Sequence, residues 1–155
     1  MSPLPMYQSR SEWREARSPT LIIACADGRW RDHIEDFAAN GLHIDAAYDL
    51  LMVPGGAEPL ALADLIPKDF NFLRRRLDML VPAHGIRRIV LIAHENCGWY
   101  RARKLGPSTV DLKARQLADL RRARTRLQEW FPEAGVETYF ARVDGNPPRA
   151  MFEPV

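Results

Sequence analysis

Two short stretches of the sequence place side chains with metal-binding and acid–base chemistry at fixed spacings. Cys25, Asp27 and Arg29 stand at alternate positions in CADGRW, directly after the apolar run LIIA. His94 and Cys97 stand three residues apart in HENCG, directly after the apolar run IVLIA. Two thiolates and one imidazole suit zinc, and three protein ligands leave a tetrahedral position open for catalysis. We therefore treat Cys25, His94 and Cys97 as candidate zinc ligands.

The residues that follow Cys25 fit a role beside such a metal. Water bound at the open position would have a lowered pKa and would supply hydroxide near neutral pH. Asp27 is two residues from a candidate ligand, so its carboxylate can accept a hydrogen bond from that water. Arg29 can hold this carboxylate with two parallel hydrogen bonds and keep it from becoming the fourth ligand. A strand continuing through these residues would point all three side chains the same way.

The segments around these stretches predict an α/β fold with a mostly parallel, four-stranded sheet. Continuous apolar runs are typical of strands buried on both faces, and strands that alternate with helical patterns indicate helices on both sides of the sheet. Ligands bind such sheets at the carboxyl ends of the strands, where both polar stretches are expected to lie. Strands are predicted at residues 20–25, 48–53, 87–94 and 136–143, and helices at 31–40, 59–66, 68–85 and, capped by Ser108, at 109–131.

Length and composition limit the class of protein. The 155 residues are expected to form a single domain spanning residues 1–155, with an N-terminal arm at 1–18 and a proline-rich tail at 144–155. No apolar run approaches the roughly 18 residues of a membrane helix, and MSPLPMYQSR lacks the pattern of a signal peptide. We therefore expect a cytoplasmic chain with no membrane partner, in which the two cysteines do not form a disulfide.

Two ordinary readings compete with the metal site. Buried cysteines at strand ends are commonly inert small hydrophobes, and Asp27 with Arg29 would then form a surface ion pair of little energetic consequence. The H-x-x-C spacing alone is a weak signal. Two cysteines at the same end of neighbouring strands, one of them with a nearby histidine, favour the metal.

The patterns C-x-D-x-R at residues 25–29 and H-x-x-C-G at residues 94–98 resemble the paired signature of the β-class carbonic anhydrases. The order of strands, motifs and helices is also similar over roughly residues 18 to 145. The resemblance implies a β-carbonic-anhydrase-like fold, Zn²⁺ bound by Cys25, His94 and Cys97, and an Asp27–Arg29 dyad that orients bound water. It further implies a zinc-dependent lyase in which zinc-bound hydroxide hydrates carbon dioxide to bicarbonate, assembled as a homodimer or higher homo-oligomer.

The sequence departs from this family beside the motifs. Gly98 is followed by bulky Trp99 and Tyr100, and a Val-Pro-Gly-Gly-Ala stretch at 53–57 replaces the family's Arg-Asn-x-Ala. The family's glutamine before the first strand has no match. We expect the pocket walls to include the Gly55–Gly56 turn and Trp99 or Tyr100. Two alternatives stay open: hydrolysis of carbonyl sulfide or carbon disulfide on the same zinc site, and a non-catalytic, zinc-stabilised binding module.

The segment 101–126 is rich in arginine and lysine. It has few interleaved aromatic residues, and it also contains Asp111 and Asp119. This composition favours a solvated helix face, including the basic helix 113–126, or an interface to an acidic partner, over a nucleic-acid-binding surface.

Overall fold

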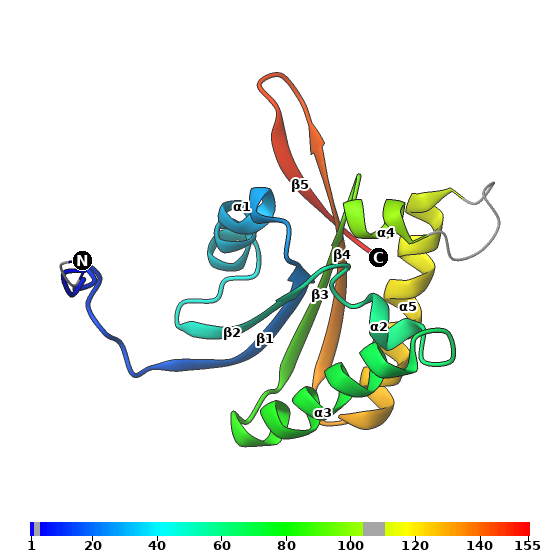
Figure 1. Ribbon diagram of the computed structural model, residues 1–155, viewed down its shortest axis with the longest axis horizontal. Helices are drawn as coiled ribbons and strands as arrows, with labels where there is room; N and C mark the ends of the chain where they lie inside the picture. The colour runs from blue at the N-terminus through cyan, green and yellow to red at the C-terminus, as the bar shows by residue number, and fades with distance from the viewer. Residues whose placement is uncertain (2–3, 104–110) are drawn as a thin grey trace.

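The computed structural model describes residues 1, 4–103 and 111–155. A five-stranded sheet with the order β2-β1-β3-β4-β5 runs through the centre of the molecule (Figure 1). The first four strands are parallel and β5 is antiparallel to β4. The strands are β1 (Arg17–Cys25), β2 (Ala47–Val53), β3 (Arg88–His94), β4 (Gly135–Asp144) and β5 (Arg149–Pro154). The predicted α/β class with a mostly parallel sheet is confirmed.

The sheet has one strand more than the four predicted, because residues 149–154 of the proline-rich tail pair with β4. The prolines of the tail do not prevent this pairing. Pro147 and Pro148 lie in the turn between the strands, and Pro154 is the last residue of β5. Proline is tolerated at such places because β5 is an edge strand, where a missing N–H breaks few ladder bonds.

Helices cover both faces of the sheet, as the alternating pattern predicted. α1 lies against one face, whereas α2, α3 and α5 lie against the other (Figure 1). The predicted cap Ser108 lies outside the described residues, and Asp111 is the residue that caps α5 by accepting a hydrogen bond from Lys113 N at 3.1 Å. The helices are α1 (Arg31–Asp36), extended by a π-helical turn (Phe37–Gly41), α2 (Glu58–Ala61), α3 (Pro67–Ala83), α4 (Gly98–Ala102) and α5 (Leu112–Trp130).

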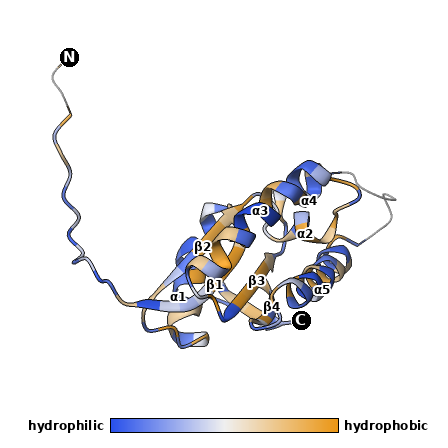
Figure 2. Ribbon diagram, turned by 90° about the horizontal axis from the view of Figure 1, so that it is seen from below, coloured by the Kyte–Doolittle hydropathy of each residue, from blue (hydrophilic) through white to orange (hydrophobic). Residues whose placement is uncertain are grey.

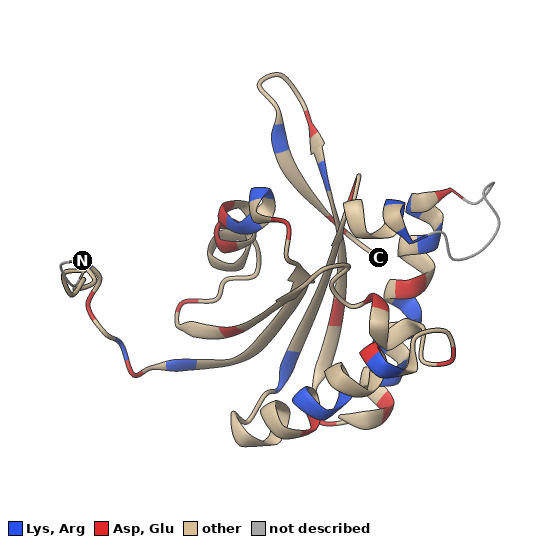
Figure 3. Cartoon of the chain, viewed as in Figure 1, with Lys and Arg blue, Asp and Glu red and all other residues tan. Residues whose placement is uncertain are grey.

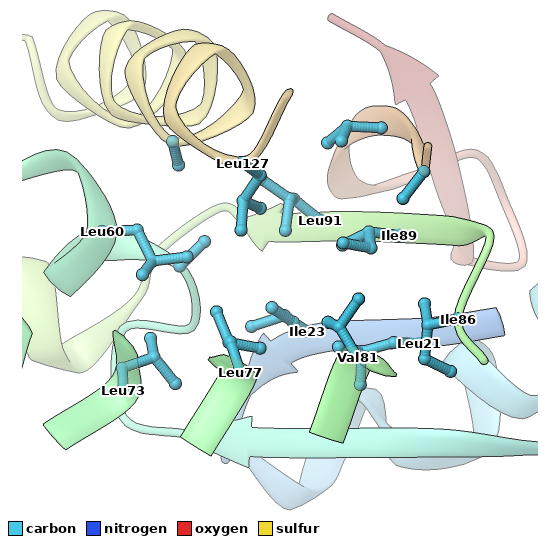
Figure 4. Packing of buried hydrophobic residues seen from close by; sticks show 14 of the residues in the cluster. Leu21, Ile23, Leu60, Leu73, Leu77, Val81, Ile86, Ile89, Leu91 and Leu127 are labelled. Atoms are coloured by element: carbon cyan, nitrogen blue, oxygen red, sulfur yellow. The ribbon is translucent and has the colours of Figure 1, made fainter. Parts of the chain in front are cut away.

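The apolar strands are buried because successive side chains contribute to two separate cores. Leu21 and Ile23 of β1 point toward Leu77 of α3 (Figure 4). Ile22, between them, packs in the second core with Ile34 of α1. A strand that must be apolar on both faces cannot alternate, which explains the unbroken hydrophobic run.

The register of the parallel strands brings the two polar stretches to one edge. Ala24 of β1 pairs with Ile92 of β3, so that Cys25 and His94 end neighbouring strands at almost the same height. On the other side, Cys25 pairs with Val53, the last residue of β2. The turns that follow all three strands therefore meet at the carboxyl edge, as predicted from the sequence.

The N-terminal arm projects from the domain, and charged residues cover the outer helices (Figures 2 and 3). Residues before β1 run away from the sheet (Figure 2), and the side chain of Trp13 there is exposed.

Basic and acidic residues are intermixed on α3 and α5 (Figure 3). The basic segment also serves the fold, since Arg124 donates to the Val155 carbonyl at 3.0 Å and Arg126 donates to the Leu60 carbonyl. Within the described ranges, the structure contains no helix with the length and hydropathy needed to span a bilayer.

Candidate metal centre

The structure brings the three predicted ligands together at the carboxyl edge of the sheet. The ligand atoms of Cys25, His94 and Cys97 lie within 4.8 Å of one another, and all three residues are buried. The two Sγ atoms are 3.8 Å apart. This is far beyond the roughly 2.05 Å of a disulfide. It matches the separation of about 3.8 Å expected for two sulfurs bound to one tetrahedral zinc at about 2.3 Å.

His94 presents one ring nitrogen in the form that a metal requires. Its Nδ1 lies 2.8 Å from the carbonyl oxygen of Glu95, which can only accept, so Nδ1 carries the proton. Nε2 is buried and has no hydrogen-bond partner among the described residues. A buried nitrogen lone pair is costly when nothing binds it. The donor set and this unpaired nitrogen therefore fit a metal ion.

The electrostatics of the cluster favour a cation. Hydrogen bonding from the Cys97 thiol lowers the pKa of Cys25 to about 4, and the same contact, together with burial, raises the pKa of Cys97. Burial lowers the pKa of His94, but the neighbouring Cys25 thiolate and the hydrogen bond to the Glu95 carbonyl outweigh it and raise the pKa overall. One thiolate is thus stabilised already, and a divalent cation would displace the second thiol proton.

Asp27 and Arg29 form the predicted pair, but the backbone between them is a turn and not a strand. β1 ends at Cys25, and residues 28–30 form a 3₁₀ turn that Asp27 caps by accepting from Arg29 N at 3.1 Å. The strand-like continuation expected from the alternate spacing is therefore wrong. The Arg29 side chain curls back, with Nη2 at 2.6 Å from Oδ2 and Nε at 3.0 Å from Oδ1. These hydrogen bonds lower the pKa of Asp27 to about 2.

Two buried polar residues of α5 support the cluster and were missed by sequence reasoning. Gln116 Nε2 donates to the His94 carbonyl oxygen at 2.9 Å, and Asp119 accepts from the Tyr100 hydroxyl at 2.9 Å. The sequence placed Asp119 on a solvated face, but it is 3% exposed, and burial raises its pKa. Its apolar neighbour Leu120 was the available signal, because that residue marks the face of the helix turned to the core.

Replacing Gln116 by methionine is expected to weaken both the fold and the metal site. The His94 carbonyl would lose its side-chain donor in a buried place, which costs about 1–3 kcal/mol in the free energy of unfolding. Partners that orient metal ligands also change metal affinity, here by about tenfold or more. Urea unfolding and zinc competition measure the two effects. Gln128→Met, exposed on the same helix, is the matched control, and equal behaviour of the two variants would contradict this role.

The walls beside the cluster were predicted to be the Gly55–Gly56 turn and Trp99 or Tyr100. Trp99 packs against the cluster that Cys25, Cys97 and Tyr100 form. Tyr100 is buried in the same cluster but points its hydroxyl to Asp119. Gly55 has φ +79°, and a Cβ there would lie 2.8 Å from Trp99 Nε1 and closer still to Cδ1. The indole therefore occupies the space that the glycine leaves. The glycine turn at 53–57 and the bulky Trp99, which both depart from the family signature, are thus structurally coupled.

Gly55→Ala is accordingly expected to lower the free energy of unfolding by about 1–3 kcal/mol, because it combines a left-handed backbone with overlap on the indole. Thermal or urea unfolding gives the measurement. Gly98→Ala is the control, since a Cβ at Gly98 meets no described atom within 4 Å and its φ is not left-handed. If Gly55→Ala is as stable as Gly98→Ala, the coupling of Gly55 to Trp99 is wrong.

Comparison with known proteins agrees with this architecture. The family model described as "Putative carbonic anhydrase" matches residues 16–149. An uncharacterized protein of Rickettsia conorii is 27% identical over 130 residues, which are 81% of this chain and 68% of the relative. A carbonic anhydrase from Glaciozyma antarctica has a TM-score of 0.50 at 16% identity, over 80% of this chain and 76% of its own. The β-carbonic anhydrase isoform I of Trichomonas vaginalis has a TM-score of 0.50 at 13% identity, over 93% of this chain and 87% of its own. The chain therefore belongs to the family of the matching model, as a divergent member with a β-carbonic-anhydrase-like fold.

Proposed function

We propose that the protein is a zinc-dependent lyase that hydrates carbon dioxide to bicarbonate. The observation that carries the proposal is the convergence of Cys25, His94 and Cys97, with the His94 Nε2 lone pair unused by any described residue. Zinc held there would lower the pKa of a bound water and so supply hydroxide near neutral pH. Family membership and fold are in line with this reaction.

Asp27 and Arg29 have distinct tasks in the proposed reaction. With a pKa near 2, Asp27 is ionised throughout the neutral range, so its carboxylate can accept a hydrogen bond and orient the attacking water. Arg29 donates hydrogen bonds to both carboxylate oxygens of Asp27. That pairing holds the carboxylate in place and restrains it from binding the metal itself.

Metal analysis combined with stopped-flow kinetics tests the proposal. The purified protein is expected to hold about one zinc per chain, and its carbon dioxide hydration rate should rise in proportion to zinc content. A native protein without zinc, or a fully loaded one that does not accelerate hydration, would rule the proposal out.

A second candidate is hydrolysis of carbonyl sulfide or carbon disulfide on the same site. The observation in its favour is the altered wall of the site, where Trp99 packs beside the candidate ligands and fills the space over Gly55. Rates measured with each substrate on the same zinc-loaded sample separate the two reactions. A third candidate is a non-catalytic, zinc-stabilised binding module, which binds zinc without activating water. One form of it has Asp27 as the fourth ligand, and the pairing of Asp27 with Arg29 gives that form less support.

We also propose that the protein is a homodimer or a higher homo-oligomer. Phe72 and Met79 stand seven residues apart on α3 and Leu65 lies in the turn before it, and each is about half exposed or more, at 48%, 60% and 63%. Large exposed apolar side chains on one segment are typical of an association surface. Sedimentation velocity tests the proposal, and a monomer at micromolar concentration would contradict it.

A further inference from the structure

Glu58 is a buried acid that the proposed reaction does not use. It begins α2, and its side chain is 0% exposed. Neither carboxyl oxygen has a hydrogen-bond partner within the usual distance in the described part of the chain, and burial raises its pKa. The cation that faces it is Arg103, whose Nε is 3.6 Å from Oε1. A carboxyl is costly to bury, so this position calls for an explanation.

Trp99 is held on several sides by residues from different elements. Its ring fills the space over Gly55. Arg103 follows the last residue of α4, and its guanidinium lies over the indole at 4.4 Å from the ring centroid. This is a favourable cation–π contact. Arg103 is itself anchored, because its Nη2 lies 2.6 Å from Asp69 Oδ2 at the start of α3. Glu58 also faces Arg103, so two carboxylates hold the guanidinium that stacks on the ring, and the ring has little freedom to change rotamer.

The indole also lies between two features of the site. It packs against the cluster of Cys25, Cys97 and Tyr100, and it lines the apolar cavity of about 190 Å³ that Val53 and Phe72 help to form. Val53 pairs with Cys25 in the sheet, so the cavity begins one strand away from the cluster. One side chain therefore separates the candidate ligands from this cavity.

We propose that Trp99 is a specificity-determining wall that limits the metal centre to very small molecules, and that Glu58 is the positioning residue that fixes this wall through Arg103, whose guanidinium faces the Glu58 carboxylate and stacks on the indole. The inference rests on the proposed function for its meaning: a linear triatomic such as carbon dioxide passes, and bulkier molecules are excluded from the metal. Removal of the indole would join the apolar cavity to the cluster.

The hold of Glu58 on Trp99 is tested by hydrogen exchange at the indole nitrogen, followed by NMR on the native protein. Glu58→Met removes the carboxylate that faces Arg103, so the guanidinium holds the ring less firmly and exchange of the Trp99 N–H is expected to become about tenfold faster. Glu58→Gln keeps an acceptor oxygen and should restore slow exchange, and Glu129→Met, exposed on α5, should leave it unchanged. Equal exchange rates in the Glu58→Met variant and the native protein would overturn the positioning role.

The wall is tested by zinc extraction with the bulky chelator 4-(2-pyridylazo)resorcinol. Only the part of the rate that grows with chelator concentration reports access to the metal, because spontaneous loss of zinc is independent of it. Trp99→Ala is expected to raise that part by about tenfold or more, as discrimination by pocket size allows. Trp130→Ala, at the far end of α5, is the control. An unchanged concentration-dependent rate in Trp99→Ala would overturn the wall.

These two readouts separate the inference from the proposed function. A zinc protein that shows the predicted extraction rates and indole exchange but no hydration would contradict the reaction and support the wall. If the native protein hydrates carbon dioxide but Trp99→Ala leaves the concentration-dependent extraction rate unchanged, the reaction is supported and the wall is contradicted. If the native protein binds no zinc, the proposed function falls, and the exchange rates at Trp99 decide whether Glu58 fixes the indole.

Discussion

Replacing Cys97 by serine is expected to remove zinc from the protein and to abolish hydration. Its Sγ is buried 3.8 Å from Cys25 Sγ, and a serine hydroxyl is a poor zinc ligand in a site built from two thiolates and an imidazole. Changes to residues that only orient metal ligands already cost 10- to 100-fold. Loss of a ligand should therefore reduce zinc affinity and activity by more than about 100-fold. Zinc content by elemental analysis and stopped-flow hydration give the two values.

The same test on histidine has a matched control in the chain. His94→Asn should behave as Cys97→Ser does, whereas His43→Asn should keep both zinc and activity. His43 is exposed and has φ 56°, a conformation that asparagine adopts readily. If Cys97→Ser or His94→Asn retains full zinc and full activity, the assignment of these ligands is wrong.

Arg29→Gln is expected to separate metal binding from activity. Arg29 pairs with both oxygens of Asp27, so its removal frees the carboxylate to turn toward the metal and become a fourth ligand. Zinc affinity should then stay level or rise. Hydration should fall by about 100-fold or more, since the open position is closed and the oriented acceptor is lost. Zinc competition and hydration kinetics on one sample measure both quantities.

Arg31→Gln is the matched control for that experiment, because Arg31 is exposed on α1, two residues further along. It should leave zinc affinity and hydration unchanged. The account would be contradicted if Arg29→Gln were as active as Arg31→Gln, or if it lost zinc and activity together. The second result would mean that Arg29 supports the ligands themselves and not the position of Asp27.

The elements that position the site could be predicted because their signals are local. The runs that became β1 and β3 are apolar throughout, and a short, fully apolar run before a polar turn indicates a buried parallel strand. Once the two strands are neighbours, the carboxyl edge must hold both Cys25 and His94. The convergence of the cluster follows from sheet geometry, and no property of the loops had to be known.

The features that escaped prediction depend on tertiary contacts. Asp119 is of a residue type that is common on surfaces, and its burial is explained by tertiary contact with the Tyr100 hydroxyl. The tail became β5 because β4 offered an unpaired edge, which a proline-rich sequence does not reveal. Gly55 and Trp99 look like two separate departures from the family signature until their contact is seen. Buried Glu58 carries no sequence signal at all.

The most direct test of the central claim is anomalous diffraction at the zinc edge from crystals of the native protein. The account predicts one zinc site per chain, bonded to Cys25 Sγ, Cys97 Sγ and His94 Nε2. It also predicts a fourth ligand that no protein atom supplies, while Asp27 remains paired with Arg29. The absence of an anomalous peak at this cluster, or a peak with the Asp27 carboxylate as fourth ligand, would contradict it.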